Sequence, residues 1–160
     1  MEMKHDIKWK ALLPSLAIPL ATGGLSAFLT KDGMRAFASL RQPPLSPPGW
    51  LFPVVWTILY LLMGVAAARV SLSEAGEKRR AALRLYLVQL GVNFVWPLLF
   101  FNRQAFGFAF VWLALLFALI VWLTLSFREI DRAAPILLMP YLLWVAFAGY
   151  LNLGVWMLNS

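Results

Sequence analysis

Amide and aromatic side chains that could hold an apolar ligand recur at helical spacing within one apolar stretch. In LYLVQLGVNFVWPLLFF, Gln89, Asn93 and Trp96 fall at positions i, i+4 and i+7. On a helix this spacing places all three on one face. Amides facing lipid would be costly, so the face is expected to point into a bundle. For Gln89, hydrogen bonding between helices is an equal alternative to ligand binding, at about 0.6 kcal/mol per contact.

A second candidate face lies in the last apolar stretch, PYLLWVAFAGYLNLGVWMLN. There Trp144, Ala148 and either Leu151 or Asn152 share one side of a helix. The small Ala148 either leaves room for a ligand beside Trp144 or lets another helix approach closely. Earlier in the chain, Trp56 and Tyr60 stand four residues apart.

Position along an apolar run separates interfacial tryptophans from interior ones. Tryptophans near helix ends commonly form belts at the membrane surface, and Trp9, Trp50 and Trp156 fit that role. Trp56, Trp96 and Trp144 lie further from the ends of their apolar runs, so they are the candidates for the interior of the bundle. Indoles and amides without charges suit a large, flat, mostly apolar ligand, held by stacking and oriented by a few polar groups.

The interiors of the apolar stretches lack the ionisable side chains that catalysis, metal binding or coupled transport would need. No Asp, Glu, Lys, Arg or His lies deep inside them, and the only histidine is His5. Neither a metal site nor a histidine-based triad can be assembled, and acid–base catalysis is not expected. Coupled transporters usually need ionisable groups at membrane depth, so coupled transport is not expected either. No cofactor is required.

The elements that position these residues follow from composition. The 160 residues are 62% apolar and 13% charged, against about 45–50% and 25% in soluble domains. Helices of ~20 apolar residues span a membrane, and the runs lack the alternation of a barrel strand. The sequence predicts an all-α, single-domain bundle of five transmembrane helices, over residues 9–29, 50–70, 81–101, 105–127 and 133–158.

The first run has one alternative reading. Lysines precede it, at Lys4, Lys8 and Lys10, as they would in a signal peptide. The run is longer than a typical signal core and no clear A-x-A site follows, so a membrane helix is expected instead.

The net charge of +7 is read as a topology signal and not as a nucleic-acid site. Numbering the segments alternately puts ten basic residues on one side and four on the other. The smaller group is Lys31, Arg35, Arg41 and Arg103. The positive-inside rule then predicts a cytoplasmic N-terminus, with the C-terminus outside. Basic residues such as Lys78, Arg79 and Arg80 are expected to meet anionic lipid headgroups.

The connection between the first two helices is expected to be a long loop, residues 30–49. Loops of that length are uncommon in compact proteins and are often lids or binding loops. Its second half, LRQPPLSPPGW, contains prolines that disfavour helix and stiffen an extended chain. The sequence therefore predicts a semi-rigid lid on the outer side.

The segments PPLSPPGWLFPVVWTILYLLMG, LYLVQLGVNFVWPLLFF and LLMPYLLWVAFAGYLN together resemble the translocator protein family, also called tryptophan-rich sensory protein or peripheral benzodiazepine receptor. The likeness spans nearly the whole chain and indicates a bacterial-type member in a bacterial cell membrane. It implies a five-helix bundle, often a homodimer through its transmembrane helices. It also implies a pocket beneath the first loop that binds porphyrins such as protoporphyrin IX, sterols and benzodiazepine-site drugs.

Carried over by position, the resemblance and the helical faces above give one set of expected ligand-binding residues. These are Phe37, Pro47, Trp56, Tyr60, Gln89, Asn93, Trp96, Phe100, Trp144, Ala148 and Leu151. The two tryptophans that the family uses in light-dependent porphyrin breakdown correspond to Trp56 and Trp144.

Three departures from the family pattern affect the expected site. A usual Trp-Tyr pair reads Ala36-Phe37, and the proline-rich segment 42–48 reads QPPLSPP, without the usual lysine and tryptophan. No Lys or Arg follows Tyr150, so the cholesterol-motif pattern is absent, which lowers the expectation of tight sterol binding.

Three functions follow from these observations. The leading one is a membrane receptor or sensor for porphyrins and related apolar ligands. The alternatives are light-dependent porphyrin degradation, which would be an enzyme-like activity, and facilitated transport of tetrapyrroles or lipid-like compounds.

Overall fold

Five long helices make up the chain in a computed structural model, which describes residues 2–74 and 76–160, with side chains from residue 9 onward. The helices are α1 (Glu2–Phe37), α2 (Leu51–Ser71), α3 (Glu77–Pro97), α4 (Phe106–Arg128) and α5 (Ala134–Asn159). Each contains a stretch long and apolar enough to cross a membrane. Together with the absence of strands from the described residues, this confirms the predicted all-α membrane bundle.

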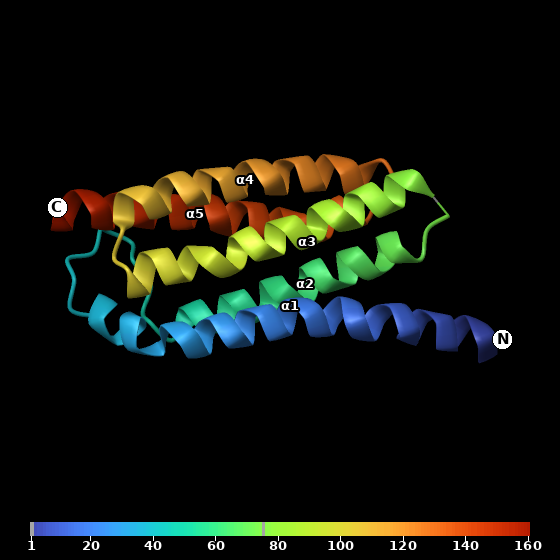
Figure 1. The fold of residues 1–160 in the computed structure, drawn as a ribbon, viewed down its shortest axis with the longest axis horizontal. Coiled ribbons are helices and arrows are strands. Elements are labelled where there is room, and N and C mark those ends of the chain that lie inside the picture. Colours follow the sequence, from blue (N-terminus) through green and yellow to red (C-terminus); the bar gives the residue numbers. More distant parts are fainter. Residues whose placement is uncertain (1, 75) are drawn as a thin grey trace.

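The helices pack side by side in a closed ring. Going around it, α1 contacts α2, α2 contacts α5, α5 contacts α4, α4 contacts α3, and α3 returns to α1. The two chain ends lie at opposite ends of the bundle, and the α1–α2 connection lies at the end where the chain finishes (Figure 1). The α2–α3 and α4–α5 connections lie together at the other end (Figure 1).

Helix α1 is longer than the sequence predicts, and this corrects the long lid loop. The helix continues through residues 30–37, so the α1–α2 connection is only residues 38–50. Hydropathy detects where a helix meets water and not where its backbone hydrogen bonds end, so polar residues such as Lys31 and Asp32 extend the helix past the apolar run. The other helices begin and end within a few residues of the predicted runs.

A short π-helical turn, η1 (Leu98–Asn102), follows α3 directly. Pro97 closes α3 and has no N–H to donate, and Arg103 N–H then bonds to Leu98 O five residues back, at 3.0 Å. The wider turn lets the chain lie against α1, where Asn102 Nδ2 donates to Leu29 O at 2.9 Å. Gly33 makes this approach feasible, because a Cβ there would lie 2.7 Å from the backbone of Phe101.

Candidate functional site

An aromatic cavity opens between four helices and η1, at the end of the bundle near the α1–α2 connection. Its volume is about 230 Å³. The lining comes from α1, α2, α3, η1 and α5, while α4 contributes none of it. No Asp, Glu, Lys, Arg or His is among the described side chains that line it.

Most of the residues expected to bind a ligand come together in this cavity. The lining includes eight of the predicted positions: Phe37, Trp56, Tyr60, Trp96, Phe100, Trp144, Ala148 and Leu151. Helical spacing accounts for part of this convergence, since Trp56 and Tyr60 lie on one face of α2, and Trp144, Ala148 and Leu151 lie on one face of α5.

Stacked rings form one wall of the cavity. Trp96 lies over Phe100 with their ring centroids 5.0 Å apart and nearly parallel planes, and Phe37 meets Phe100 at 5.4 Å. Phe37 reaches this cluster because α1 continues to that residue. The η1 turn likewise carries Phe100 and Phe101 inward. The wall therefore depends on two local features, the extended α1 and the π-turn.

Asn152 fixes the orientation of Trp96. Trp96 Nε1 donates to Asn152 Oδ1 at 3.0 Å, and Asn152 Nδ2 donates to Phe106 O at 2.8 Å. Asn152 also lines the cavity. The shared face of Trp144, Ala148 and Leu151 or Asn152 was the sequence signal for it, and both alternatives contribute to the lining.

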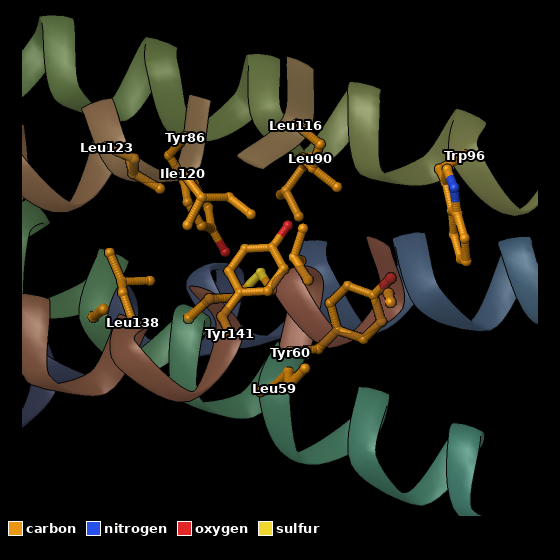
Figure 2. Close-up of a cluster of buried hydrophobic side chains, with 14 of the residues drawn as sticks. Leu59, Tyr60, Tyr86, Leu90, Trp96, Leu116, Ile120, Leu123, Leu138 and Tyr141 are labelled. Atoms are coloured by element: carbon orange, nitrogen blue, oxygen red, sulfur yellow. The ribbon is translucent and has the colours of Figure 1, made fainter. Parts of the chain in front are cut away.

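Two of the expected residues, Gln89 and Asn93, lie behind the cavity wall instead of in it. Tyr60 Oη donates to Asn93 Oδ1 at 2.7 Å, and Asn93 Nδ2 donates to Tyr141 Oη at 2.8 Å. Tyr141 Oη in turn donates to Gln89 Oε1 at 2.7 Å. Figure 2 shows Tyr60 and Tyr141 projecting into the core, with Trp96 further along the bundle. The amides thus hold the tyrosines in place, and only Tyr60 of this network faces the cavity.

Pro47 lies outside the lining, in the α1–α2 connection. That connection is attached to α5 by side chains that sequence analysis did not single out. Asn159 accepts a hydrogen bond from Arg41 N–H at 3.1 Å and donates to Arg41 O at 2.7 Å. Tyr150 Oη donates to Pro44 O at 2.7 Å. The buried Pro43 packs against Gly154, where a Cβ would lie 2.5 Å from the proline ring.

Two of the lining residues carry a buried donor without a hydrogen-bond partner in the described part of the chain. Trp144 Nε1 and Ser26 Oγ find no hydrogen-bond partner among the described residues, and both residues line the space. The indole of Trp144 is held by Phe52, at 6.0 Å between ring centroids, and by Phe147 at 5.5 Å. Since an unsatisfied buried donor is costly, a ligand with an acceptor at this point would gain a hydrogen bond.

Comparison with known proteins agrees with this architecture. A sequence profile of the TspO/MBR family matches residues 15–157. The chain is 37% identical to the tryptophan-rich protein TspO of Chlorobaculum tepidum, over 98% of this chain and 99% of that protein. It is 38% identical to the translocator protein of Bos taurus, over 93% of this chain and 87% of that protein.

It is also 36% identical to the tryptophan-rich sensory protein of Cereibacter sphaeroides, over 96% of this chain and 94% of that protein. The match includes at least the larger part of each of the five helices and every residue that lines the cavity. The chain is an integral membrane protein that belongs to the TspO/MBR family.

Proposed function

We propose that the chain is a membrane receptor or sensor that binds porphyrins, such as protoporphyrin IX, in the aromatic cavity. The observation that carries this proposal is the lining itself, with stacked rings, the free donor of Trp144 Nε1 and no charged side chain among the described residues. Flat apolar ligands gain from stacking on such walls. Sterols and benzodiazepine-site drugs are further candidates for the same apolar space. The sensory and translocator names of the relatives accord with ligand binding.

A porphyrin would require the cavity to enlarge. Its 230 Å³ falls below the ~300–1,000 Å³ of typical small-molecule sites. Helix α1 is the least buried of the five helices, because only 11% of its most apolar stretch is buried, against 28–39% in the others. Eight lining residues belong to α1, including Met34 and Phe37. Ligand entry is therefore expected to displace this helix together with the α1–α2 connection.

Titration of protoporphyrin IX into the purified protein, followed by tryptophan quenching, tests the proposal. Trp144→Ala removes a ring and a donor from the lining, and we expect it to weaken binding roughly tenfold, about 1.4 kcal/mol. Trp122→Ala is the matched control, because Trp122 is 62% exposed on α4, outside the cavity. Equal affinity in the two variants would refute this site.

Light-dependent degradation of the bound porphyrin is a second candidate, favoured by the placement of Trp56 and Trp144 on the same cavity. An indole can donate an electron to an excited porphyrin, with molecular oxygen as the terminal oxidant. Under illumination in air, porphyrin absorbance is expected to fall faster with the wild type than with the Trp56→Phe/Trp144→Phe variant. Equal rates would eliminate this activity.

We further propose that the protein lies in a bacterial cell membrane with its N-terminus in the cytoplasm. The basic residues Arg69, Arg128 and Arg132 and the basic segment 78–84 lie at or near the helix ends that meet at the end of the bundle opposite the C-terminus (Figure 1). The positive-inside rule places that end in the cytoplasm. A reporter fused to the C-terminus that is active only outside the cytoplasm would check this orientation. An inactive reporter would mean that the C-terminus lies in the cytoplasm and that the proposed orientation is wrong.

A further inference from the structure

A second concave site lies at the opposite end of the bundle from the α1–α2 connection. It is a groove between the last turns of α4 and the first turns of α5, and it shares no residue with the aromatic cavity. Its floor and walls include Thr124, Leu125, Arg128, Arg132, Ile136 and Met139. Because α4 ends at Arg128 and α5 begins at Ala134, the groove runs from the edge of the membrane span into it.

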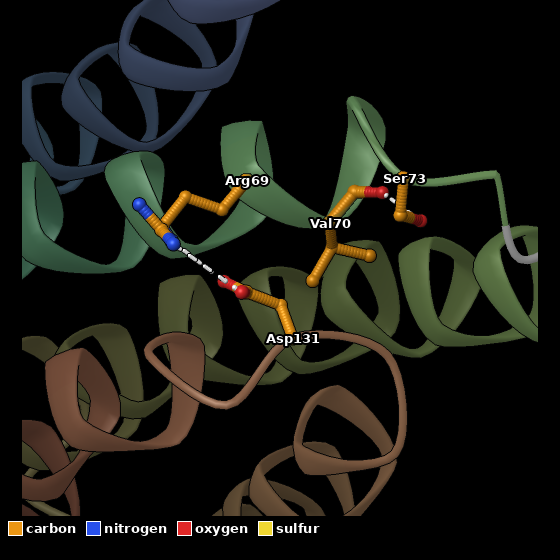
Figure 3. A network of polar contacts seen from close by, with 4 residues as sticks. All are labelled: Arg69, Val70, Ser73 and Asp131. Carbon is orange, nitrogen blue, oxygen red and sulfur yellow. Dashed lines mark hydrogen bonds and ion pairs between the residues drawn. The ribbon is translucent and has the colours of Figure 1, made fainter.

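Two arginines place positive charge at the outer end of this groove. Arg128 and Arg132 are exposed, and neither forms an ion pair with any side chain that the structure describes. The nearby Asp131 is engaged elsewhere, because Arg69 Nε donates to its Oδ2 at 2.6 Å (Figure 3). Glu129 is not part of the lining. The groove therefore presents two guanidinium groups, and arginine is the side chain best suited to binding phosphate.

The inner part of the groove is apolar. Leu125, Ile136 and Met139 are 55%, 70% and 43% exposed, and they lie about one turn deeper into the membrane-spanning helices than the arginines. A soluble anion would leave these side chains unused. A molecule with a negative headgroup and a hydrocarbon chain would contact both parts at once.

We propose that this groove binds an anionic phospholipid. Its phosphate lies between Arg128 and Arg132, and one acyl chain runs along Leu125, Ile136 and Met139. The site adds to the diffuse attraction between basic residues and anionic headgroups, which contributes about 1 kcal/mol per residue. It is independent of the ligand in the aromatic cavity.

The test measures how much phosphatidylglycerol stays bound to the purified full-length protein, by native mass spectrometry at increasing lipid concentration. The Arg128→Gln/Arg132→Gln variant is expected to bind it at least roughly 30-fold more weakly, because each arginine loses its charge-assisted hydrogen bond to the phosphate. The control is Lys78→Gln/Arg84→Gln, which removes two exposed charges from the same end of the bundle, outside the groove. It is expected to retain binding within a few-fold. Arg128→Lys/Arg132→Lys keeps the charge and should fall between the two.

Three outcomes would overturn the proposal. Equal losses in the groove variant and the control would mean diffuse headgroup attraction without a site. Displacement of the lipid by excess inorganic phosphate would mean a phosphate site without the acyl contact. Unchanged binding in the groove variant would mean that the arginines do not contribute to lipid binding. If the double variant does not fold, each single variant, Arg128→Gln or Arg132→Gln, is expected to lose one charge-assisted hydrogen bond to the phosphate and to bind at least roughly fivefold more weakly, which decides the question.

Discussion

Tyr60 and Asn93 form a 2.7 Å hydrogen bond that joins the cavity to the core behind it, since Tyr60 lines the cavity and Asn93 does not. Asn93 is the central member of the network, because it also donates to Tyr141. A ligand that contacts the ring of Tyr60 therefore rests on a side chain whose hydroxyl group is fixed from behind.

The first prediction concerns the energy of this bond. In a double-mutant cycle of Tyr60→Phe and Asn93→Ala, we expect a coupling free energy between about 0.6 and 1.7 kcal/mol, the range for hydrogen bonds between membrane helices. Unfolding by denaturing detergent measures it. A cycle of Tyr60→Phe with Asn102→Ala serves as the uncoupled control, because the Asn102 side chain bonds to Leu29 O and not to Tyr60. Additive effects in both cycles would contradict the network.

The second prediction concerns the close packing of α1 on η1. Gly33→Ala would place a methyl group 2.7 Å from the Phe101 backbone, so the variant is expected to lose roughly 1–3 kcal/mol of stability. Gly24→Ala, on the same helix, meets no atom within 4 Å and is expected to be neutral or stabilising by up to about 1 kcal/mol. Melting temperatures in detergent compare the two. Similar shifts would show that η1 does not press on α1.

The third prediction concerns acid sensitivity at the α4–α5 connection. The hydrogen bond from Arg69 holds the pKa of Asp131 below its ordinary value, and backbone N–H groups of Ala133 and Ala134 act in the same direction. The folded state thus favours the carboxylate. The resulting stabilisation is complete above the ordinary aspartate pKa of ~3.9 and is lost as the pH falls through the lowered folded value.

Melting temperatures measured from neutral pH down to about pH 3 check this expectation. Asp131→Asn should be less stable than wild type at neutral pH, and the difference should shrink as the solution becomes acidic. A difference that stays constant with pH would mean that the carboxylate charge contributes nothing.

The fourth prediction concerns the attachment of the α1–α2 connection to α5. Asn159→Ala removes both hydrogen bonds to Arg41, so the Arg41 amide is expected to exchange its hydrogen about fivefold faster, corresponding to about 1 kcal/mol. Leu158→Ala is the control at an exposed neighbouring position. Hydrogen exchange resolved to this segment gives the measurement. Unchanged exchange would mean that the Tyr150–Pro44 hydrogen bond and the packing of Pro43 hold the segment without Asn159.

The membrane spans could be predicted because hydropathy and length determine them directly. The η1 turn could not, since a change from α to π hydrogen bonding leaves no trace in hydropathy. For the same reason the predicted loop included residues 30–37, which belong to α1.

Helical spacing identified the faces that line the cavity, as with Trp144 and Ala148. It could not separate lining residues from those one layer behind. Gln89 and Asn93 share a face with Trp96, yet tertiary hydrogen bonds turn their amides toward Tyr60 and Tyr141. The contacts of Asn159 and Tyr150 with the α1–α2 connection join residues more than a hundred positions apart, and no local pattern encodes them.

If porphyrin binds in the aromatic cavity, a larger side chain that fills the cavity must weaken its binding. Ala148 is 4% exposed and lines the cavity, whereas Ala146 is exposed on the same helix and does not. The measurement is the dissociation constant of protoporphyrin IX for Ala148→Phe and Ala146→Phe. We predict at least roughly tenfold weaker binding for Ala148→Phe, about 1.4 kcal/mol, and wild-type affinity for Ala146→Phe. Wild-type affinity in both variants would mean that porphyrin does not bind in this cavity.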